Sequence, residues 1–288
     1  MSFVIGSIVV IGTGLIGTSV ALAARRSGLA VYLADRDPAV AREAAALGAG
    51  TVGYPRAPAD LAVVAVPPGA VGWTVAAAQA DRVALAFTDV AGVKAEPEQA
   101  VNRLALDPAA YVGGHPMAGR ERSGPAAACV DLFVGRTWAL TPSDRTSPWA
   151  VQLARELVAA CGAVPLELSS RAHDEAVAVT SHTPHLVASL MAARLRDAPA
   201  VTSALAGQGL RDVTRIAAGD AGLWVDILRA NAPAVRAVVR DLLADLAVVD
   251  SALEALAEPA GGGRSAGAGA VRDLLERGIE GAARIPRP

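Results

Sequence analysis

The sequence predicts an α/β fold in which a mostly parallel sheet is followed by an all-helical domain. Over the first 168 residues, runs of β-branched and other apolar residues alternate with helical patterns, which is typical of strands buried on both faces by crossover helices. From residue 169 onward the patterns are helical and no convincing strand is found. We therefore expect a sheet domain over residues 1–168 and a helical domain over residues 169–288.

Each strand is expected where β-branched and apolar residues run together: 7–11, 30–34, 61–66, 83–88, 111–113, 137–140 and 164–168. Helices are expected where apolar residues recur at helical spacing: 15–27, 38–47, 242–256 and 271–277. Gly28 and Gly48 mark the ends of the first two helices. Gly261–Gly263 predicts a flexible break before the last helix. The Ala-rich helical domain is expected to bury an apolar stripe against a second copy, as a homodimer.

Composition excludes several classes of protein. Hydrophobic residues make up 53% and charged residues 19%, the reverse of a disordered chain. With 26 basic and 28 acidic side chains, the charge is balanced, so we expect no binding to nucleic acid or to an anionic membrane. Cys129 and Cys161 fit neither a disulfide framework nor a zinc cluster, which favours a reducing, cytoplasmic location.

Two uncharged stretches are long enough to be considered as membrane spans, residues 1–24 and 61–80. Four glycines crowd the first stretch, and no basic segment precedes it as a signal peptide requires. Pro67-Pro68-Gly69 interrupts the second. We interpret both as a buried strand, a turn and a helix, and we expect no membrane segment.

The motif Gly12-x-Gly14-x-x-Gly17 follows a predicted strand and opens a predicted helix, as in Rossmann-type dinucleotide sites. The first glycine makes the tight turn, the second lets a pyrophosphate approach the backbone, and the third lets helix and strand pack closely. Leu15 and Ile16 begin the helix, whose N-terminal N–H groups would face the phosphates.

Asp35 closes the second strand, 18 positions after Gly17, where a carboxylate is expected to bind the ribose hydroxyls. That carboxylate repels a 2′-phosphate, which favours NAD over NADP, whereas Arg36 favours the opposite because arginine accepts such a phosphate. Val66 and Pro67 follow the third strong strand, where open α/β sheets bind ligands. They either form a wall of the nicotinamide site or make a simple loop.

His115 is preceded by two glycines and followed by a proline, in a segment that lets a bulky ligand approach the ring. We interpret His173 as a residue at a helix start beside Asp174. No carboxylate or cysteine lies close to His182 and His185 in the sequence to complete a set of metal ligands, so we expect no metal site.

Pro184 lies between His182 and His185 and is expected to start or kink a helix. Ser181 or Thr183 would cap that helix.

Taken together, these segments resemble the prephenate dehydrogenases, which convert prephenate to 4-hydroxyphenylpyruvate on the way to tyrosine. The resemblance covers nearly the whole chain. Besides the glycine motif, it rests on residues 89–94 (DVAGVK), 114–119 (GHPMAG) followed by Ser123-Gly124, 179–185 (VTSHTPH), 209–217 (GLRDVTRIA) and Trp224.

The resemblance implies an NAD-dependent enzyme that removes hydride from the ring carbon bearing the hydroxyl while the ring carboxylate leaves as carbon dioxide. His115 would be the general base for that hydroxyl, and Arg215 the bidentate partner of a substrate carboxylate. His185 and His182 would line the substrate pocket from the helical domain. Asp89, at the end of a strand, is expected among the NAD-binding residues.

The chain departs from the family pattern at Gly92, where many members carry a serine whose hydroxyl lies near the catalytic histidine. Glu121 could favour arogenate, whose ammonium would offset a carboxylate, or pair with a neighbouring arginine. Arogenate and an amino-substituted analogue therefore stay open as substrates beside prephenate. Arg211 and Asp212 are expected to form a local ion pair near the mouth of the site.

Two other functions are compatible with the same architecture. A β-hydroxyacid-type dehydrogenase uses a lysine on a helix of its second domain, but the single lysine here, Lys94, lies in the first domain. A cofactor-sensing binding protein would need no proton acceptor, so His115 and Arg215 together count against that class.

Overall fold

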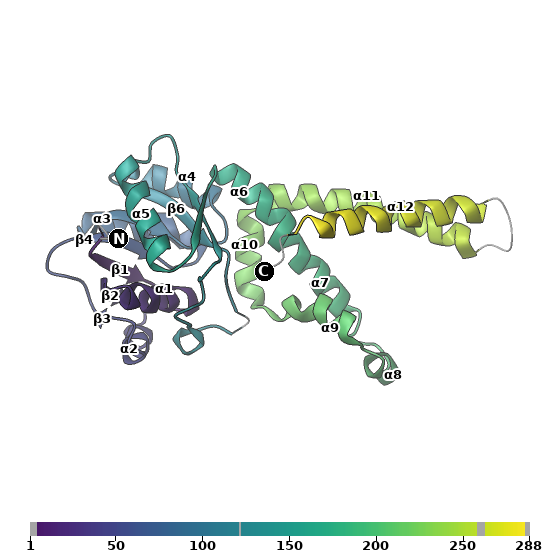
Figure 1. Cartoon of the computed structure of the whole chain (residues 1–288), viewed down its shortest axis with the longest axis horizontal. Coiled ribbons are helices and arrows are strands. Elements are labelled where there is room, and N and C mark those ends of the chain that lie inside the picture. The colour runs from purple at the N-terminus through teal and green to yellow at the C-terminus, as the bar shows by residue number, and fades with distance from the viewer. Residues whose placement is uncertain (1–4, 121, 258–262, 286–288) are drawn as a thin grey trace. The chain divides into compact units, whose positions relative to one another are not determined.

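The computed structural model describes residues 5–120, 122–257 and 263–285 (Figure 1). The chain forms two compact units, Met1–Ala232 and Pro233–Pro288. The first unit contains the sheet, the helices that cover it and a group of shorter helices that follow it in the sequence. The second unit is helical.

An eight-stranded sheet forms the centre of the first unit, in the order β3-β2-β1-β4-β5-β6-β7-β8. All neighbouring strands are parallel except β6 and β7, which are antiparallel, so the predicted fold class is confirmed. The strands are β1 (Ser7–Ile11), β2 (Ala30–Ala34), β3 (Thr51–Val52), β4 (Ala59–Val64), β5 (Ala84–Asp89), β6 (Tyr111–Pro116), β7 (Thr137–Thr141) and β8 (Val164–Glu167).

The inner strands β1, β4, β5 and β6 are largely buried on both faces, as their apolar runs predict, whereas the edge strands β3 and β8 are exposed. In β1, Ile8 and Val10 belong to one apolar cluster and Val9, on the other face, to a second. Five helices in this part of the chain contribute apolar residues to the two clusters: α1 (Leu15–Arg26), α2 (Pro38–Ala46), α3 (Val71–Ala80), α4 (Ala95–Leu104) and α5 (Pro148–Ala160). Single turns of 3₁₀ helix are η1 (Pro68–Ala70), η2 (Pro108–Ala110) and η3 (Pro125–Ala127).

Strand β6 is longer than the predicted strand at 111–113, because residues 113–116 pair with the antiparallel neighbour β7. His115 pairs with Ala139 in this register. The strand β3 is not predicted by the sequence, since two residues are too few for a pattern. The extension of β6 matters for function, because it puts His115 on a strand of the sheet.

The helices that follow the sheet in the first unit are α6 (Ser170–Val177), the π-helical turn η4 (Ala178–His182), α7 (Thr183–Ala193), α8 (Ala200–Ala204), α9 (Gln208–Thr214), the 3₁₀ turn η5 (Arg215–Ala218) and α10 (Ala221–Ala230). Pro184 occupies the first turn of α7, as predicted, but no side chain caps this helix. The predicted cap at Ser181 or Thr183 is wrong, because the chain enters α7 directly from η4 and offers no free helix end.

Two long antiparallel helices, α11 (Ala232–Ala257) and α12 (Gly263–Ala283), make up most of the second unit and lie side by side (Figure 1). Arg277 donates to Asp245 at 3.0 Å across the pair. Both helices contain the segments predicted as helical and extend beyond them. Of the predicted break, Gly261 and Gly262 lie outside the described residues, and Gly263 begins α12.

Among the helices that the structure describes, none combines the length and the apolar character that crossing a bilayer requires. The change of fold predicted after residue 168 falls inside the first compact unit, and that domain boundary stays a prediction.

Candidate active site

The glycine turn between β1 and α1 shows a separate steric reason for each glycine. Gly12 has φ +96°, and a Cβ there would lie 2.2 Å from the carbonyl oxygen of Ala65. A Cβ on Gly17 would lie 1.9 Å from the carbonyl oxygen of Gly12, so helix and turn are in contact. Gly14 has open space where a Cβ would be, and no side chain caps α1, which begins after it. The turn therefore leaves room for an anion at the helix N-terminus.

Asp35, which follows β2, lies against this turn. Its Oδ2 accepts from the backbone N–H of Thr13 at 2.7 Å and from the Thr13 hydroxyl at 3.1 Å. Its Oδ1 accepts from the N–H of Asp37 at 3.0 Å. The Asp35 carboxylate is half-buried and contacts the glycine turn, and the next residue, Arg36, is exposed.

A pocket of about 890 Å³ lies between the end of β6 and the helices that follow the sheet in the first unit. Side chains from both parts line it, among them His115, Arg120, Arg122, Ser181, His185, Arg215 and Trp224. Three of these carry guanidinium groups, and no Asp or Glu is found among the lining residues that the structure describes. The pocket therefore favours an anionic ligand.

His115 lies near the end of β6, which places its ring at this pocket. Its Nδ1 is 2.9 Å from Nε2 of His173. On the other side of the ring, a Cβ built on Gly92 would lie 3.8 Å from its Nε2. Burial lowers the pKa of His115 well below its usual value, and the neighbouring His173, Lys94 and His182 lower it further. The ring is therefore neutral near pH 7, as a proton acceptor must be.

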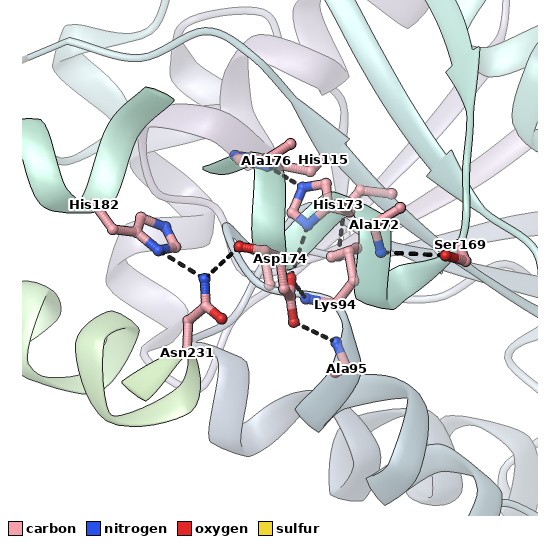
Figure 2. Close-up of polar contacts among 12 residues, drawn as sticks. Lys94, Ala95, His115, Ser169, Ala172, His173, Asp174, Ala176, His182 and Asn231 are labelled. Carbon is pink, nitrogen blue, oxygen red and sulfur yellow. Dashed lines mark hydrogen bonds and ion pairs between the residues drawn. The ribbon is translucent and has the colours of Figure 1, made fainter. Parts of the chain in front are cut away.

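His173 and Asp174, from α6, continue the contacts of His115 into the protein (Figure 2). His173 Nδ1 is 2.8 Å from Oδ1 of Asp174. The same Oδ1 accepts from the backbone N–H of Lys94 at 2.8 Å, and Oδ2 accepts from that of Ala95 at 2.9 Å. These N–H groups belong to the start of α4, which has no cap from its own side chains. Asp174 thus caps α4 from another helix.

Lys94 and Asp89 form an ion pair whose side chains are both 0% exposed. Lys94 Nζ also donates to the carbonyl oxygen of Gly114, the residue before His115. Asp89 accepts in addition from the Tyr111 hydroxyl and from backbone N–H groups, including that of Ala91 at 2.7 Å. Burial lowers the pKa of Lys94, and the Asp89 carboxylate opposes that shift. Both Asp89 oxygens are thus used inside the fold, which leaves none for the predicted contact with a nucleotide.

His182, on the π-helical turn, is 2% exposed and is not among the residues that line the pocket. Its Nδ1 is 3.1 Å from Nδ2 of Asn231, which also donates to the backbone carbonyl of Asp174 at 2.7 Å (Figure 2). Burial is the main cause that lowers the pKa of His182 to about 4. The prediction that His182 lines the substrate pocket needs correction: the ring is buried, with Asn231 at its Nδ1 and with Trp224, which does line the pocket, at a centroid distance of 6.2 Å.

His185 does line the pocket, one turn further along α7. Its ring stacks on Trp224 with centroids 3.6 Å apart and an interplanar angle of 13°. Burial lowers its pKa, and its Nδ1 has no hydrogen-bond partner among the described residues. A Cβ on Gly219 would lie 2.6 Å from Trp224 Nε1, so a glycine is needed for Trp224 to pack there.

Arg215 begins the 3₁₀ turn η5 and lines the pocket, as predicted for the partner of a substrate carboxylate. The predicted ion pair between Arg211 and Asp212 is not formed: Asp212 accepts from Gln208 at 2.8 Å, and Arg211 points to the carbonyl oxygen of Ala206. Glu121, which bears on the choice of substrate, lies outside the described residues.

Two family models match consecutive parts of the chain. The nucleotide-binding domain of prephenate dehydrogenase matches residues 20–167, and the dimerization domain of prephenate dehydrogenase matches residues 169–259. This chain belongs to the prephenate dehydrogenase family. It is therefore an oxidoreductase with a nucleotide-binding domain and the helical domain of that family.

Named relatives support this family assignment. A Streptomyces niveus protein named probable prephenate dehydrogenase NovF is 42% identical over 279 residues, which cover 96% of this chain and 77% of the relative. The cyclohexadienyl dehydrogenase of Zymomonas mobilis is 31% identical, with 85% of this chain and 88% of the relative covered. The prephenate dehydrogenase of A. aeolicus, solved with hydroxyphenyl propionate and NAD+, shares the fold, with a TM-score of 0.84 at 24% identity and coverage of 98% and 99%.

Sequence reasoning misses the two residues behind His115. The sequence predicts His173 at a helix start, but it lies in the middle of α6 and contacts the predicted base. The signal in the sequence is the adjacent pair His173-Asp174, and the structure shows that both side chains are buried. The sequence does not show which distant groups they meet.

Proposed function

We propose that this protein catalyses the NAD-dependent oxidative decarboxylation of prephenate to 4-hydroxyphenylpyruvate. The observation that carries this proposal is one pocket that brings together the neutral imidazole of His115 from β6 and the guanidinium of Arg215 from η5. A base for the ring hydroxyl and a partner for a carboxylate are the two groups that this reaction requires of the protein.

NAD fits the chain at the glycine turn. The space at Gly14 and the uncapped start of α1 suit its pyrophosphate, and Asp35 suits the hydroxyls of its ribose. Val66 and Pro67 follow β4 on the same edge of the sheet and would form part of the nicotinamide wall. When bound, NAD would supply the acceptor for the hydride.

The residues of this chain would act as follows. His115 Nε2 accepts the proton of the ring hydroxyl while the ring carboxylate leaves as carbon dioxide and the ring becomes aromatic. Arg215 holds the carboxylate of the pyruvyl side chain and so fixes the ring against His115. Trp224 and His185 form an aromatic wall of the pocket, which excludes water from one side of the substrate.

Prephenate is favoured over arogenate by the charge of the wall. Arg120, Arg122 and Arg215 would attract a substrate with two carboxylates and no ammonium. The described wall offers no carboxylate to an arogenate ammonium. A lysine-based mechanism of the β-hydroxyacid type is disfavoured, because Lys94 is fully buried against Asp89 and cannot touch a substrate.

The test is to mix the protein with NAD and prephenate and to follow the absorbance of the reduced nicotinamide. Arogenate and an amino-substituted analogue of prephenate are assayed in parallel. We expect the highest kcat/KM with prephenate, and Arg215→Ala should raise the KM for prephenate with a weaker effect on NAD affinity. No absorbance change with any of the three compounds would reject the proposal and favour a cofactor-binding sensor.

We also propose a homodimer formed through the helical domain, with the domain boundary between residues 168 and 169, and a cytoplasmic location. The match of residues 169–259 to a dimerization domain supports the first two. Exposed leucines on α11, such as Leu243 and Leu246, provide apolar surface for an interface. Light scattering on the purified protein should give twice the chain mass of 29.0 kDa.

A further inference from the structure

We propose that His173 and Asp174 are positioning residues that hold His115 in the tautomer with a bare Nε2 and a protonated Nδ1. The proposal rests on the function proposed above, in which His115 is the base. It concerns the second and third groups of a chain of contacts that runs from the pocket to the start of α4 (Figure 2).

The chain of donors and acceptors begins at Asp174. An ionised carboxylate only accepts hydrogen bonds. Its two oxygens lie against three groups: the N–H of Lys94 at 2.8 Å, the N–H of Ala95 at 2.9 Å and the Nδ1 of His173 at 2.8 Å. The first two are backbone donors at the start of α4, and they hold the carboxylate in place. Nδ1 of His173 must therefore carry a proton.

Neutral His173 with a proton on Nδ1 has a lone pair on Nε2. That lone pair faces Nδ1 of His115 at 2.9 Å, so the proton between the two rings belongs to His115. Since His115 is neutral, its Nε2 is then bare. This nitrogen is the one beside Gly92, and the ring lines the pocket.

The same contacts stabilise the charge that forms during the reaction. The proton of the substrate hydroxyl goes to His115 Nε2, and the O–H electron pair stays with the oxygen as the carbonyl-like centre forms. The Nδ1 proton of His115 is already shared with His173 Nε2, so the new positive charge is linked through His173 to the carboxylate of Asp174. When the ring carboxylate leaves as carbon dioxide, its bonding electron pair enters the ring and the ring oxygen becomes a phenolate. That oxygen takes the proton back from His115 Nε2, which restores the neutral base.

Three charged or titratable groups besides His173 bear on His115: Lys94 from the loop before α4, His182 from η4, and Asp174 behind His173. The first two disfavour a proton on His115, and Asp174 is the sole carboxylate in this chain of contacts. Both His173 and Asp174 are at most 5% exposed, so solvent does not screen their interaction.

Substitutions at His173 separate a hydrogen-bond role from simple packing. His173→Gln keeps an oxygen that accepts from His115 Nδ1, whereas His173→Phe keeps the volume and removes the acceptor. We expect kcat to fall about 10²-fold in His173→Phe and about tenfold or less in His173→Gln, with the KM and the NAD dissociation constant nearly unchanged. Equal kcat values for the two variants would show that His173 acts by packing and would overturn the proposal.

Asp174→Asn replaces the carboxylate by an amide, whose NH2 group cannot accept from the backbone N–H groups of α4 or from His173. We expect kcat to fall at least about tenfold and the acidic limb of the kcat/KM profile to move to lower pH, because protonated His115 loses the linked carboxylate. Glu175→Gln, on the neighbouring exposed side chain of α6, is the matched control and should behave as the wild type. An unchanged kcat and profile in folded Asp174→Asn would also overturn the proposal.

The tautomer can also be measured directly in the wild-type protein. Two-dimensional NMR of the ¹⁵N-labelled histidine rings, with His115 assigned by comparison with His115→Asn, should show a protonated Nδ1 and a bare Nε2 at neutral pH. The reverse tautomer, which a cationic His173 would impose, would reject the proposal. Because this spectrum needs no substrate, its result stands apart from the failure or success of the prephenate assay.

Discussion

Replacing Lys94 by methionine should destabilise the protein strongly. The substitution leaves the Asp89 carboxylate buried without a cation, since both side chains are 0% exposed. Removing one partner of a buried ion pair typically costs about 3–5 kcal/mol. At roughly 2–4 °C per kcal/mol for a domain of this size, Lys94→Met should lower the melting temperature by about 6–20 °C. Lys94→Arg should also lower it despite the conserved charge, because a larger guanidinium must replace an ammonium that is 0% exposed.

Thermal unfolding followed by circular dichroism measures this effect, with Arg171→Met as the control. Arg171 pairs with Glu175 on the surface, and its side chain is 87% exposed, so the control should stay within about 2 °C of the wild type. The double variant Lys94→Met with Asp89→Asn removes both charges and should recover part of the loss. If Lys94→Met melts within about 2 °C of the wild type, Asp89 does not need its buried partner and the argument is wrong.

Four further outcomes are expected. Gly92→Ser should raise kcat/KM for prephenate about fivefold, because one added hydrogen bond is worth ~1 kcal/mol. A Cβ at this position would make an ordinary contact of 3.8 Å with His115. A lower kcat/KM with both prephenate and arogenate would instead indicate a pocket shaped around glycine. NAD should bind much more tightly than NADP in a fluorescence titration because of Asp35, and equal affinities would point to Arg36 as the controlling residue. His115→Asn should keep NAD binding and lose about 10²–10⁴-fold in turnover, and near-normal turnover would remove His115 from the mechanism. In the wild type, the acidic limb of the kcat/KM profile should lie below pH 6.5, because the pKa of His115 is lowered. Burial lowers the pKa of His182 to about 4 in the folded protein, so between pH 6.5 and 4 the unfolded chain binds a proton that the folded chain does not. The free energy of unfolding of the wild type, measured by urea titration relative to His182→Gln, should therefore fall by about 2–3 kcal/mol over that range. A difference between the two proteins that does not depend on pH would contradict a buried neutral ring.

Elements whose cause is local follow from the amino-acid sequence alone. The apolar run at residues 7–11 and the glycines after it specify a buried strand, a tight turn and a helix, because φ +96° at Gly12 and the contact at Gly17 are demands of the turn itself. The alternation of strands and helices then specifies a mostly parallel sheet. The position of Asp35 follows from the same local order, since the ends of neighbouring parallel strands meet at one edge of the sheet.

The side chains that surround the candidate base, in contrast, are set by tertiary packing. His115 and His173 are 58 positions apart, and no periodicity in the sequence relates a strand residue to a residue of a later helix. Packing also decides which of two nearby histidines reaches the pocket: His182 is buried against Asn231, whereas His185 lines the pocket. The partner of Lys94 likewise depends on how β5 and β6 pack. Local backbone preferences act over a few residues, whereas these contacts are set by the packing of elements that meet only in the folded chain.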